Sequence, residues 1–172
     1  MKSIILLVAI LSCLQAFATD LPTVKNVEVN RYIGKWYAHY SLPQYFTRKC
    51  LGQTAEYKII DDKTISVFNT CLKKKGMSTI NGQAVVTNPG DNSELIVTFN
   101  QFFTKLFRVK GDYNILALDI DYKYVLVGSD NRKSLWLMSR SPEAIPEDVK
   151  ADYLGLAKDL GFNINKLKLS TF

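Results

Sequence analysis

The feature that most restricts the fold of this chain is a series of short segments that are apolar or that alternate between apolar and polar residues. They recur about every ten residues, and turns rich in Asp, Asn, Gly and Pro separate them. Alternation with a period of two is typical of strands that bury one face. The sequence predicts eight strands, at residues 36–42, 54–60, 64–72, 78–87, 94–99, 112–118, 122–128 and 134–139. The pattern therefore indicates an all-β, antiparallel protein whose strands are joined by short hairpins.

Eight hairpin-linked strands leave two exposed edges unless the sheet closes on itself. Closure into an up-and-down barrel removes those edges, whereas a two-sheet sandwich is the alternative that periodicity leaves open. The regular order of nearest-neighbour hairpins favours the eight-stranded antiparallel barrel. Its interior can be filled with side chains or can hold one small ligand, and both interiors give the same alternation.

One α-helix follows the strands near the C-terminus. Pro146 occupies a first-turn position, Glu147 and Asp148 follow where acidic residues favour the helix dipole, and Gly161 marks the end. The apolar positions form one stripe, made of Val149, Tyr153, Leu156 and Leu160. We therefore expect this helix to pack outside the barrel, over the last strands, which are apolar on both faces.

The N-terminus has the three parts of a signal peptide. Lys2 precedes an apolar run over residues 4–14, and the run ends in Ala16-Phe17-Ala18. Cleavage after residue 18 would leave residues 19–172 as a single domain. In the alternative route, residues 10–13 (I-L-S-C) resemble the box at which bacterial lipoproteins are cut and lipidated on Cys13. Both routes predict export, to the periplasm, the outer membrane or the medium.

Cys50 and Cys71 are the cysteines that lie beyond this N-terminal segment. An even pair in an exported chain predicts a disulfide, with two reduced thiols as the alternative. Two cysteines and a single histidine do not complete a zinc site without carboxylates, so we expect no metal. The net charge is +6, and its cations are scattered apart from Lys73-Lys74-Lys75, so nucleic-acid binding is not expected.

Three sequence motifs, in order along the chain, resemble those of the lipocalin family. Residues 30–37 (N-R-Y-I-G-K-W-Y) resemble the G-x-W opening motif, residues 119–124 (D-I-D-Y-K-Y) the T-D-Y motif, and residues 135–140 (L-W-L-M-S-R) the third, which ends in arginine. Further similarity, at residues 42–46, 54–57 and 111–113, narrows the resemblance to bacterial outer-membrane lipocalins similar to apolipoprotein D. The residues that carry the motifs are Gly34, Trp36, Asp121, Tyr122 and Arg140. The resemblance covers about residues 27–169.

This resemblance implies a calyx that is closed at one end, where Trp36 stacks beneath the guanidinium of Arg140. Since residues two apart share one face of a strand, Trp36 and Arg140 then indicate which side chains point inward. His39 falls on the outward face. The predicted cavity lining consists of Ala38, Tyr40, Ala55, Tyr57, Val67, Trp136 and Met138. On the third strand, parity alone leaves open whether residues 65, 67 and 69 or residues 66, 68 and 70 face inward.

The resemblance also implies that the protein binds, stores or transports a small hydrophobic ligand, which we expect to be a fatty acid or a lysophospholipid. Tyr45, Arg48 and Lys49 are candidates for contact with its polar head at the mouth. The alternatives are an enzyme of lipocalin type and a haem carrier in which Tyr40 or Tyr57 would bind iron. An outward His39 argues against a catalytic pair inside the cavity. We expect no cofactor and no catalysis, and the oligomeric state stays open.

Membrane contact is a further expectation. Phe102, Phe103 and Phe107 lie close together between two predicted strands, beside Lys105 and Arg108. If this segment is a loop at one end of the barrel, it would form a membrane-docking patch. The alternative is a plain strand with its connection.

Overall fold

The computed structural model describes residues 20–99 and 110–172 of the chain. The predicted signal segment, including Cys13, and the predicted patch around Phe102, Phe103 and Phe107 lie outside the described residues. No helix within the described ranges is both long and apolar enough to cross a membrane.

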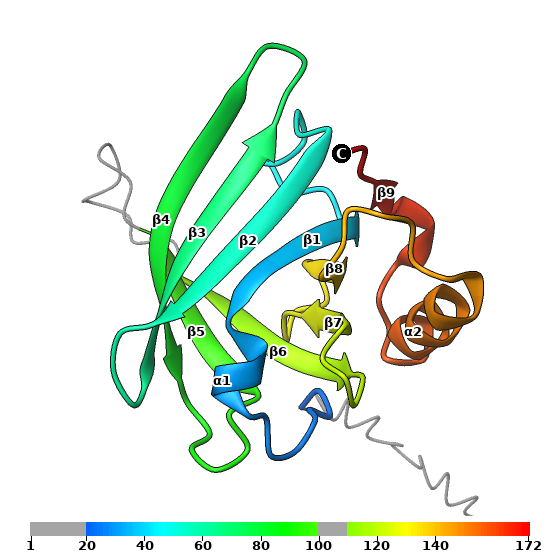
Figure 1. Ribbon diagram of the computed structural model, residues 1–172. Helices are drawn as coiled ribbons and strands as arrows, with labels where there is room; N and C mark the ends of the chain where they lie inside the picture. Colours follow the sequence, from blue (N-terminus) through cyan, green and yellow to red (C-terminus); the bar gives the residue numbers. More distant parts are fainter. Residues whose placement is uncertain (1–19, 100–109) are drawn as a thin grey trace, which may run out of the picture.

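Eight antiparallel strands form a closed barrel (Figure 1). Each strand pairs with the next one along the chain, and β1 pairs with both β8 and β2, so the ring has no free edge among these eight strands. The strands are β1 (Gly34–Ser41), β2 (Gly52–Ile59), β3 (Thr64–Leu72), β4 (Met77–Val86), β5 (Glu94–Phe99), β6 (Lys110–Leu118), β7 (Tyr124–Gly128) and β8 (Leu135–Ser139). The predicted barrel is confirmed, and the sandwich is excluded.

Four shorter or later elements complete the fold. They are α1 (Val29–Tyr32), α2 (Glu147–Asp159), the 3-10 helix η1 (Ile164–Lys166) and β9 (Lys168–Leu169). β9 adds two residues to the outer end of β1, opposite Tyr40 and Ser41. The predicted helix corresponds to α2, which lies outside the barrel beside β7 and β8 (Figure 1).

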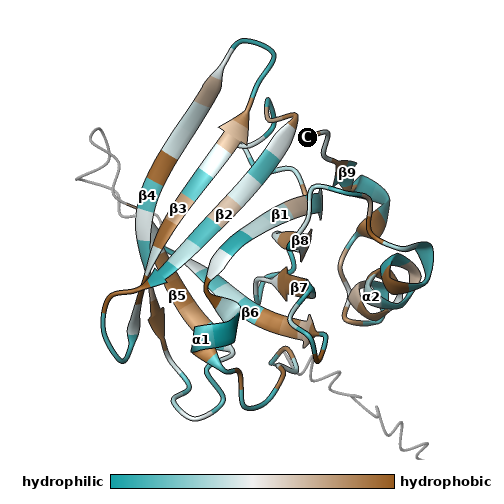
Figure 2. Cartoon of the chain, in the orientation of Figure 1, coloured by the Kyte–Doolittle hydropathy of each residue, from teal (hydrophilic) through white to brown (hydrophobic). Residues whose placement is uncertain are grey.

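The hydrophobic core has two parts, one inside the barrel and one beneath α2. Hydrophobic and hydrophilic bands alternate along β2, β3 and β4, which bury one face (Figure 2). β7 buries both faces, because Val125 and Val127 point into the barrel while Leu126 packs toward the helix. The predicted helix stripe, which comprises Val149, Tyr153, Leu156 and Leu160, packs against Leu126 and its neighbours.

Arg140 closes one end of the barrel. Its guanidinium carbon lies 3.7 Å from the centroid of the Trp36 ring, so the predicted stacking is present. Its three nitrogens donate hydrogen bonds of 2.6–3.2 Å to the carbonyl oxygens of Arg31, Tyr32, Ile33, Lys35 and Tyr122. Gly34 has a φ of +94°, a backbone conformation that residues other than glycine rarely adopt. These contacts join α1, β1 and the turn before β7 into one floor.

The turn before β7 depends on a different aspartate from the one that the motif suggests. The carboxylate of Asp119 accepts hydrogen bonds from the backbone N–H groups of Asp121, Lys123 and Tyr124. Asp121 itself makes an exposed ion pair with Lys123. Tyr122 is buried in the turn, and its hydroxyl accepts a hydrogen bond from the Glu28 N–H. Asp119 therefore has the turn-capping role, which the sequence prediction did not assign.

Candidate ligand-binding cavity

The barrel encloses a cavity of about 570 Å³. This volume lies in the range of natural small-molecule pockets, roughly 300–1,000 Å³. Its wall is formed mostly by the inward side chains of the strands, and it is largely apolar. Of the two interiors that fit the sequence pattern, the structure has the hollow one.

Six of the seven residues predicted to line the cavity do so. Ala38, Ala55, Tyr57, Val67, Trp136 and Met138 all lie on its wall. On β3 the wall also includes Ile65 and Asn69, whereas Phe68 is exposed; residues 65, 67 and 69 are therefore the inward set, and of the alternative set only Thr70, next to Cys71, reaches the wall. Contact between these side chains and a ligand stays a prediction.

The placement of Tyr40 in the lining is wrong. The register between β1 and β8 shifts between Ala38 and Tyr40, which indicates a bulge at this point. The extra residue puts Tyr40 on the outer face, where it packs with the hydrophobic cluster beneath α2. The centroid of its ring lies 5.9 Å from the Nζ of Lys150. Tyr40 is therefore no longer a candidate iron ligand, and Tyr57 alone keeps that position on the wall.

His39 lies outside the cavity but is not solvated. Its side chain is 4% exposed, and its Nε2 lies 2.9 Å from both the Ser139 hydroxyl and the Ser141 carbonyl oxygen. The ring also meets the edge of Phe172 near the C-terminus. Burial lowers the pKa of His39 below its usual value of 6.5, and the hydrogen bond that the ring can donate to the Ser141 carbonyl oxygen opposes the shift only in part.

The lowered pKa predicts a pH-dependent stability. Between the usual and the lowered pKa, the unfolded chain binds the proton and the folded chain does not, so stability falls as the pH drops below about 6.5. His39 is the single histidine of the chain. Denaturant unfolding at pH 7.5 and pH 5.5 is expected to show this loss in the wild type and a smaller loss in His39→Gln. Equal losses in the two proteins would assign the pH dependence to other groups.

Three tyrosines form a polar cluster in the mostly apolar wall. The hydroxyl of Tyr113 lies 2.6 Å from that of Tyr32 and 3.0 Å from that of Tyr57. Burial is the main cause that raises the pKa of Tyr57 to about 12 and the pKa values of Tyr32 and Tyr113 well above 10. All three phenols are therefore neutral at physiological pH. Of the three, only Tyr57 was predicted to line the cavity; Tyr32 was missed because α1 was not predicted, and Tyr113 lay in a predicted strand whose inward face was not assigned.

Asn69 adds a second polar feature to the wall. Its side-chain oxygen is buried and has no hydrogen-bond partner among the described residues. Asn69 pairs with Ala55 across β2 and β3, one inward position nearer the mouth than the Tyr57–Val67 pair. An unpaired buried acceptor is unusual, since most buried polar atoms have a partner.

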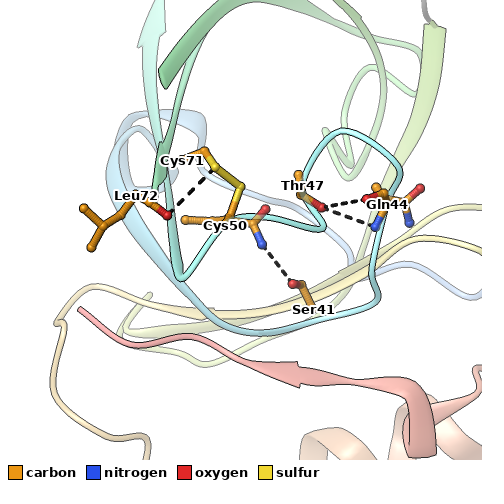
Figure 3. The surroundings of a disulfide bond; sticks show 7 residues. Ser41, Gln44, Thr47, Cys50, Cys71 and Leu72 are labelled. Carbon is orange, nitrogen blue, oxygen red and sulfur yellow. Dashed lines mark hydrogen bonds between the residues drawn. A yellow bond between two sulfur atoms is a disulfide. The ribbon is translucent and has the colours of Figure 1, made fainter. Parts of the chain in front are cut away.

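The mouth lies at the opposite end from Arg140, where a disulfide joins two segments of its rim. The Cys50–Cys71 bond is present, as predicted, and links the loop after β1 to the end of β3 (Figure 3). Within that loop, Gln44 and Thr47 are hydrogen-bonded to each other and both line the cavity, as does Phe46. Disulfides are typical of proteins in an oxidising compartment.

Tyr45 and Arg48 lie on the outer side of this rim. Tyr45 is 80% exposed, and the Arg48 guanidinium stacks over its ring at 4.4 Å. Neither residue, nor Lys49, is part of the cavity wall. Within residues 20–99 and 110–172, no group of three or more His, Cys, Asp or Glu side chains is arranged to hold a metal ion.

Comparison with known proteins agrees with this geometry. The family described as a lipocalin-like domain matches residues 27–171. Temperature-induced lipocalin-1 of Arabidopsis thaliana is 33% identical over 151 residues, which cover 86% of this chain and 81% of the relative. Outer membrane lipoprotein Blc of Escherichia coli K12 is 33% identical over 145 residues, which cover 83% and 78%.

A solved structure gives the same fold. Insecticyanin from the tobacco hornworm Manduca sexta superposes with a TM-score of 0.70, covering 90% of this chain and 85% of insecticyanin, at 20% identity. The structural match supports the barrel alone, whereas the family match and the two relatives confirm the resemblance that the sequence motifs indicated. The chain belongs to the lipocalin family, whose members bind small hydrophobic ligands.

Proposed function

We propose that this protein binds and carries a fatty acid or a lysophospholipid in its barrel. The observation that carries the proposal is the cavity of about 570 Å³ with a mostly apolar wall. An acyl chain that enters it loses contact with water, which contributes about 25 cal/mol per Å² of buried apolar surface. Because the closed barrel holds the wall in place, little conformational order has to be gained on binding.

The polar head of such a ligand would lie at the mouth. Arg48 and Lys49 on the loop after β1, and Lys73, Lys74 and Lys75 in the β3–β4 hairpin, make this rim cationic. In the described part of the chain, none of these five cations has a carboxylate within ion-pair distance. A carboxylate or phosphate head can therefore approach them without displacing a carboxylate that is already paired with them.

Export is part of the same proposal. The disulfide fits an oxidising compartment, and one relative is by its name an outer membrane lipoprotein. We propose that the chain reaches the periplasm, the outer membrane or the medium, after cleavage at residue 18 or after lipidation of Cys13. The mass of the mature N-terminal peptide distinguishes the two routes.

Tryptophan fluorescence tests the proposed ligand class. The chain has two tryptophans: Trp136 lies on the cavity wall, and Trp36 is fully buried against Arg140. Titration of the delipidated protein with a long-chain fatty acid or a lysophospholipid is expected to give a saturable change. In Trp136→Phe most of that change is expected to disappear, while calorimetry still detects binding. If neither lipid binds the wild type, the proposed ligand class is wrong.

Charge reversal tests the role of the mouth. The double variant Arg48→Glu with Lys49→Glu is expected to bind an anionic fatty acid about tenfold more weakly, since each exposed charge contributes up to about 1 kcal/mol. The effect should shrink as salt is added. Lys63→Glu with Lys158→Glu is the matched control, because Lys63 lies in the β2–β3 turn and Lys158 on α2. Unchanged affinity in the Arg48→Glu with Lys49→Glu variant would mean that the head group does not contact this part of the rim.

A further inference from the structure

The tyrosine cluster has more protons than its internal hydrogen bonds use. Tyr32, Tyr57 and Tyr113 carry three O–H protons, and the cluster contains two contacts between hydroxyls. Each contact uses one proton, whatever the direction of the bond. Among the described residues the three hydroxyls have no other hydrogen-bond partner, so one of the three protons is not used in a hydrogen bond. Since all three side chains line the cavity, this proton is available to a ligand.

We infer that the cavity binds an apolar ligand that carries an uncharged hydroxyl group on its buried portion, and that this hydroxyl bonds to the tyrosine cluster. The inference rests on the proposed function and deepens it. A plain hydrocarbon end at this depth would cover the leftover donor without giving it a partner. A buried donor without a partner costs free energy, so the cluster discriminates against such an end.

An uncharged group fits this position better than a carboxylate. The burial that raises the pKa values of these phenols also disfavours an anion brought beside them. Arg140 at the closed end is not free to pair with such an anion. Its guanidinium already donates to five carbonyl oxygens of the floor, and it does not line the cavity. The cations that have no carboxylate partner among the described residues, and that can therefore pair with an anionic head, are at the mouth instead.

A hydroxyl rather than a carbonyl is favoured by Asn69. Its unpaired oxygen can accept a hydrogen bond but cannot donate one, whereas the tyrosine cluster has one O–H group free to donate. Ligand groups at this depth therefore meet both a donor and an acceptor. Tyr57 and Asn69 are diagonal neighbours on β2 and β3, about 7–8 Å apart between backbones. A hydroxyl group has both functions, whereas a ketone or ester oxygen only accepts.

The test compares two ligands that differ in a single hydroxyl: a long-chain fatty acid and its ω-hydroxylated form of equal length. Both are titrated by calorimetry into the wild type and into a triple variant, Tyr32→Phe with Tyr57→Phe and Tyr113→Phe. A triple change is needed, because removing a single hydroxyl leaves one unused proton for Tyr32 or Tyr57 and two for Tyr113, through which both contacts run. The three rings remain, and replacing a hydrogen-bonded group together with its partners by apolar isosteres costs little stability.

The wild type is expected to bind the hydroxylated acid at least as tightly as the plain acid. In the triple variant the ratio of the two affinities is expected to shift by about tenfold in favour of the plain acid, the equivalent of one hydrogen bond to a buried group. The matched control replaces three tyrosines outside the cavity, Tyr37→Phe with Tyr124→Phe and Tyr153→Phe, and should leave the ratio unchanged.

The remaining outcomes separate the two claims. If the plain acid binds the wild type and the affinity ratio is the same in the triple variant, the hydroxyl inference is overturned while the proposed function stands. A loss of affinity that is equal for both ligands overturns it as well, because the carboxyl end would then be the buried one. If neither acid binds the wild type, the proposed function fails and the inference falls with it.

Discussion

Replacing Trp36 with alanine is expected to lower the free energy of unfolding by about 3–5 kcal/mol, the range for removal of a buried tryptophan. The ring is fully buried, its Nε1 donates to the Tyr32 carbonyl oxygen at 2.9 Å, and its face covers the Arg140 guanidinium. The variant would leave a void beneath a cation that has lost its aromatic contact. Urea unfolding, followed by the fluorescence of Trp136, measures the loss.

Trp136→Ala is the matched control for this prediction, with Trp36 then serving as the fluorophore. Trp136 is only partly buried and lines a space that is already hollow, so its removal enlarges a cavity without opening a new one in close-packed surroundings. We expect a smaller loss of stability than for Trp36→Ala. An equal or larger loss would contradict the assignment of Trp36 as the principal packing residue of the closed end.

The strand pattern could be predicted from the sequence because the barrel satisfies local and long-range requirements with the same residues. Asn88-Pro89-Gly90-Asp91-Asn92 provides turn geometry, and the flanking residues of β4 and β5 alternate between buried and exposed positions. Hairpin register follows from such turns, so inward parity could be carried from strand to strand. Ala55 and Tyr57 were placed on the wall by the apolar alternation of their strand, and Trp136 and Met138 because they share a face with Arg140.

Parity failed at Tyr40 because a bulge leaves little trace in the sequence. Ala38, His39 and Tyr40 alternate in polarity as an uninterrupted strand would, and the register shift becomes visible only when β8 is aligned beside them. The buried site outside the barrel that receives His39 is completed by Phe172, which is far away in the sequence. Such a site depends on tertiary packing rather than on local pattern.

The polar cluster of the cavity could not be predicted for a similar reason. Tyr32 comes from a short helix before the first strand, Tyr57 from β2 and Tyr113 from β6, so their hydroxyls meet only once the barrel has closed. Each of these tyrosines, taken alone, fits an ordinary core position. The cluster is identified by the short distances between the hydroxyl oxygens, and the alternation of polar and apolar residues along the sequence does not reveal those distances.

Removal of the disulfide has the second large effect that we predict. The double variant Cys50→Ser with Cys71→Ser is expected to unfold with a free energy about 3 kcal/mol lower than the wild type, because the bond closes a loop across 21 positions and restricts the unfolded chain. Urea unfolding of both proteins, monitored by circular dichroism, gives the difference. Changing both cysteines together avoids a single reactive thiol at the mouth.

Reduced wild type provides the control, since it lacks the bond but keeps both sulfur atoms. Its unfolding midpoint in the presence of reductant should match that of the double variant, which would assign the loss to the cross-link rather than to the serines. Backbone hydrogen bonds from Leu51 to Leu72 and from Thr171 to Leu51 still hold the rim in the folded state, so the cavity should survive at low denaturant. A double variant within about 1 kcal/mol of the wild type would contradict the chain-entropy account. It would mean that the unfolded chain already keeps this loop compact without the bond.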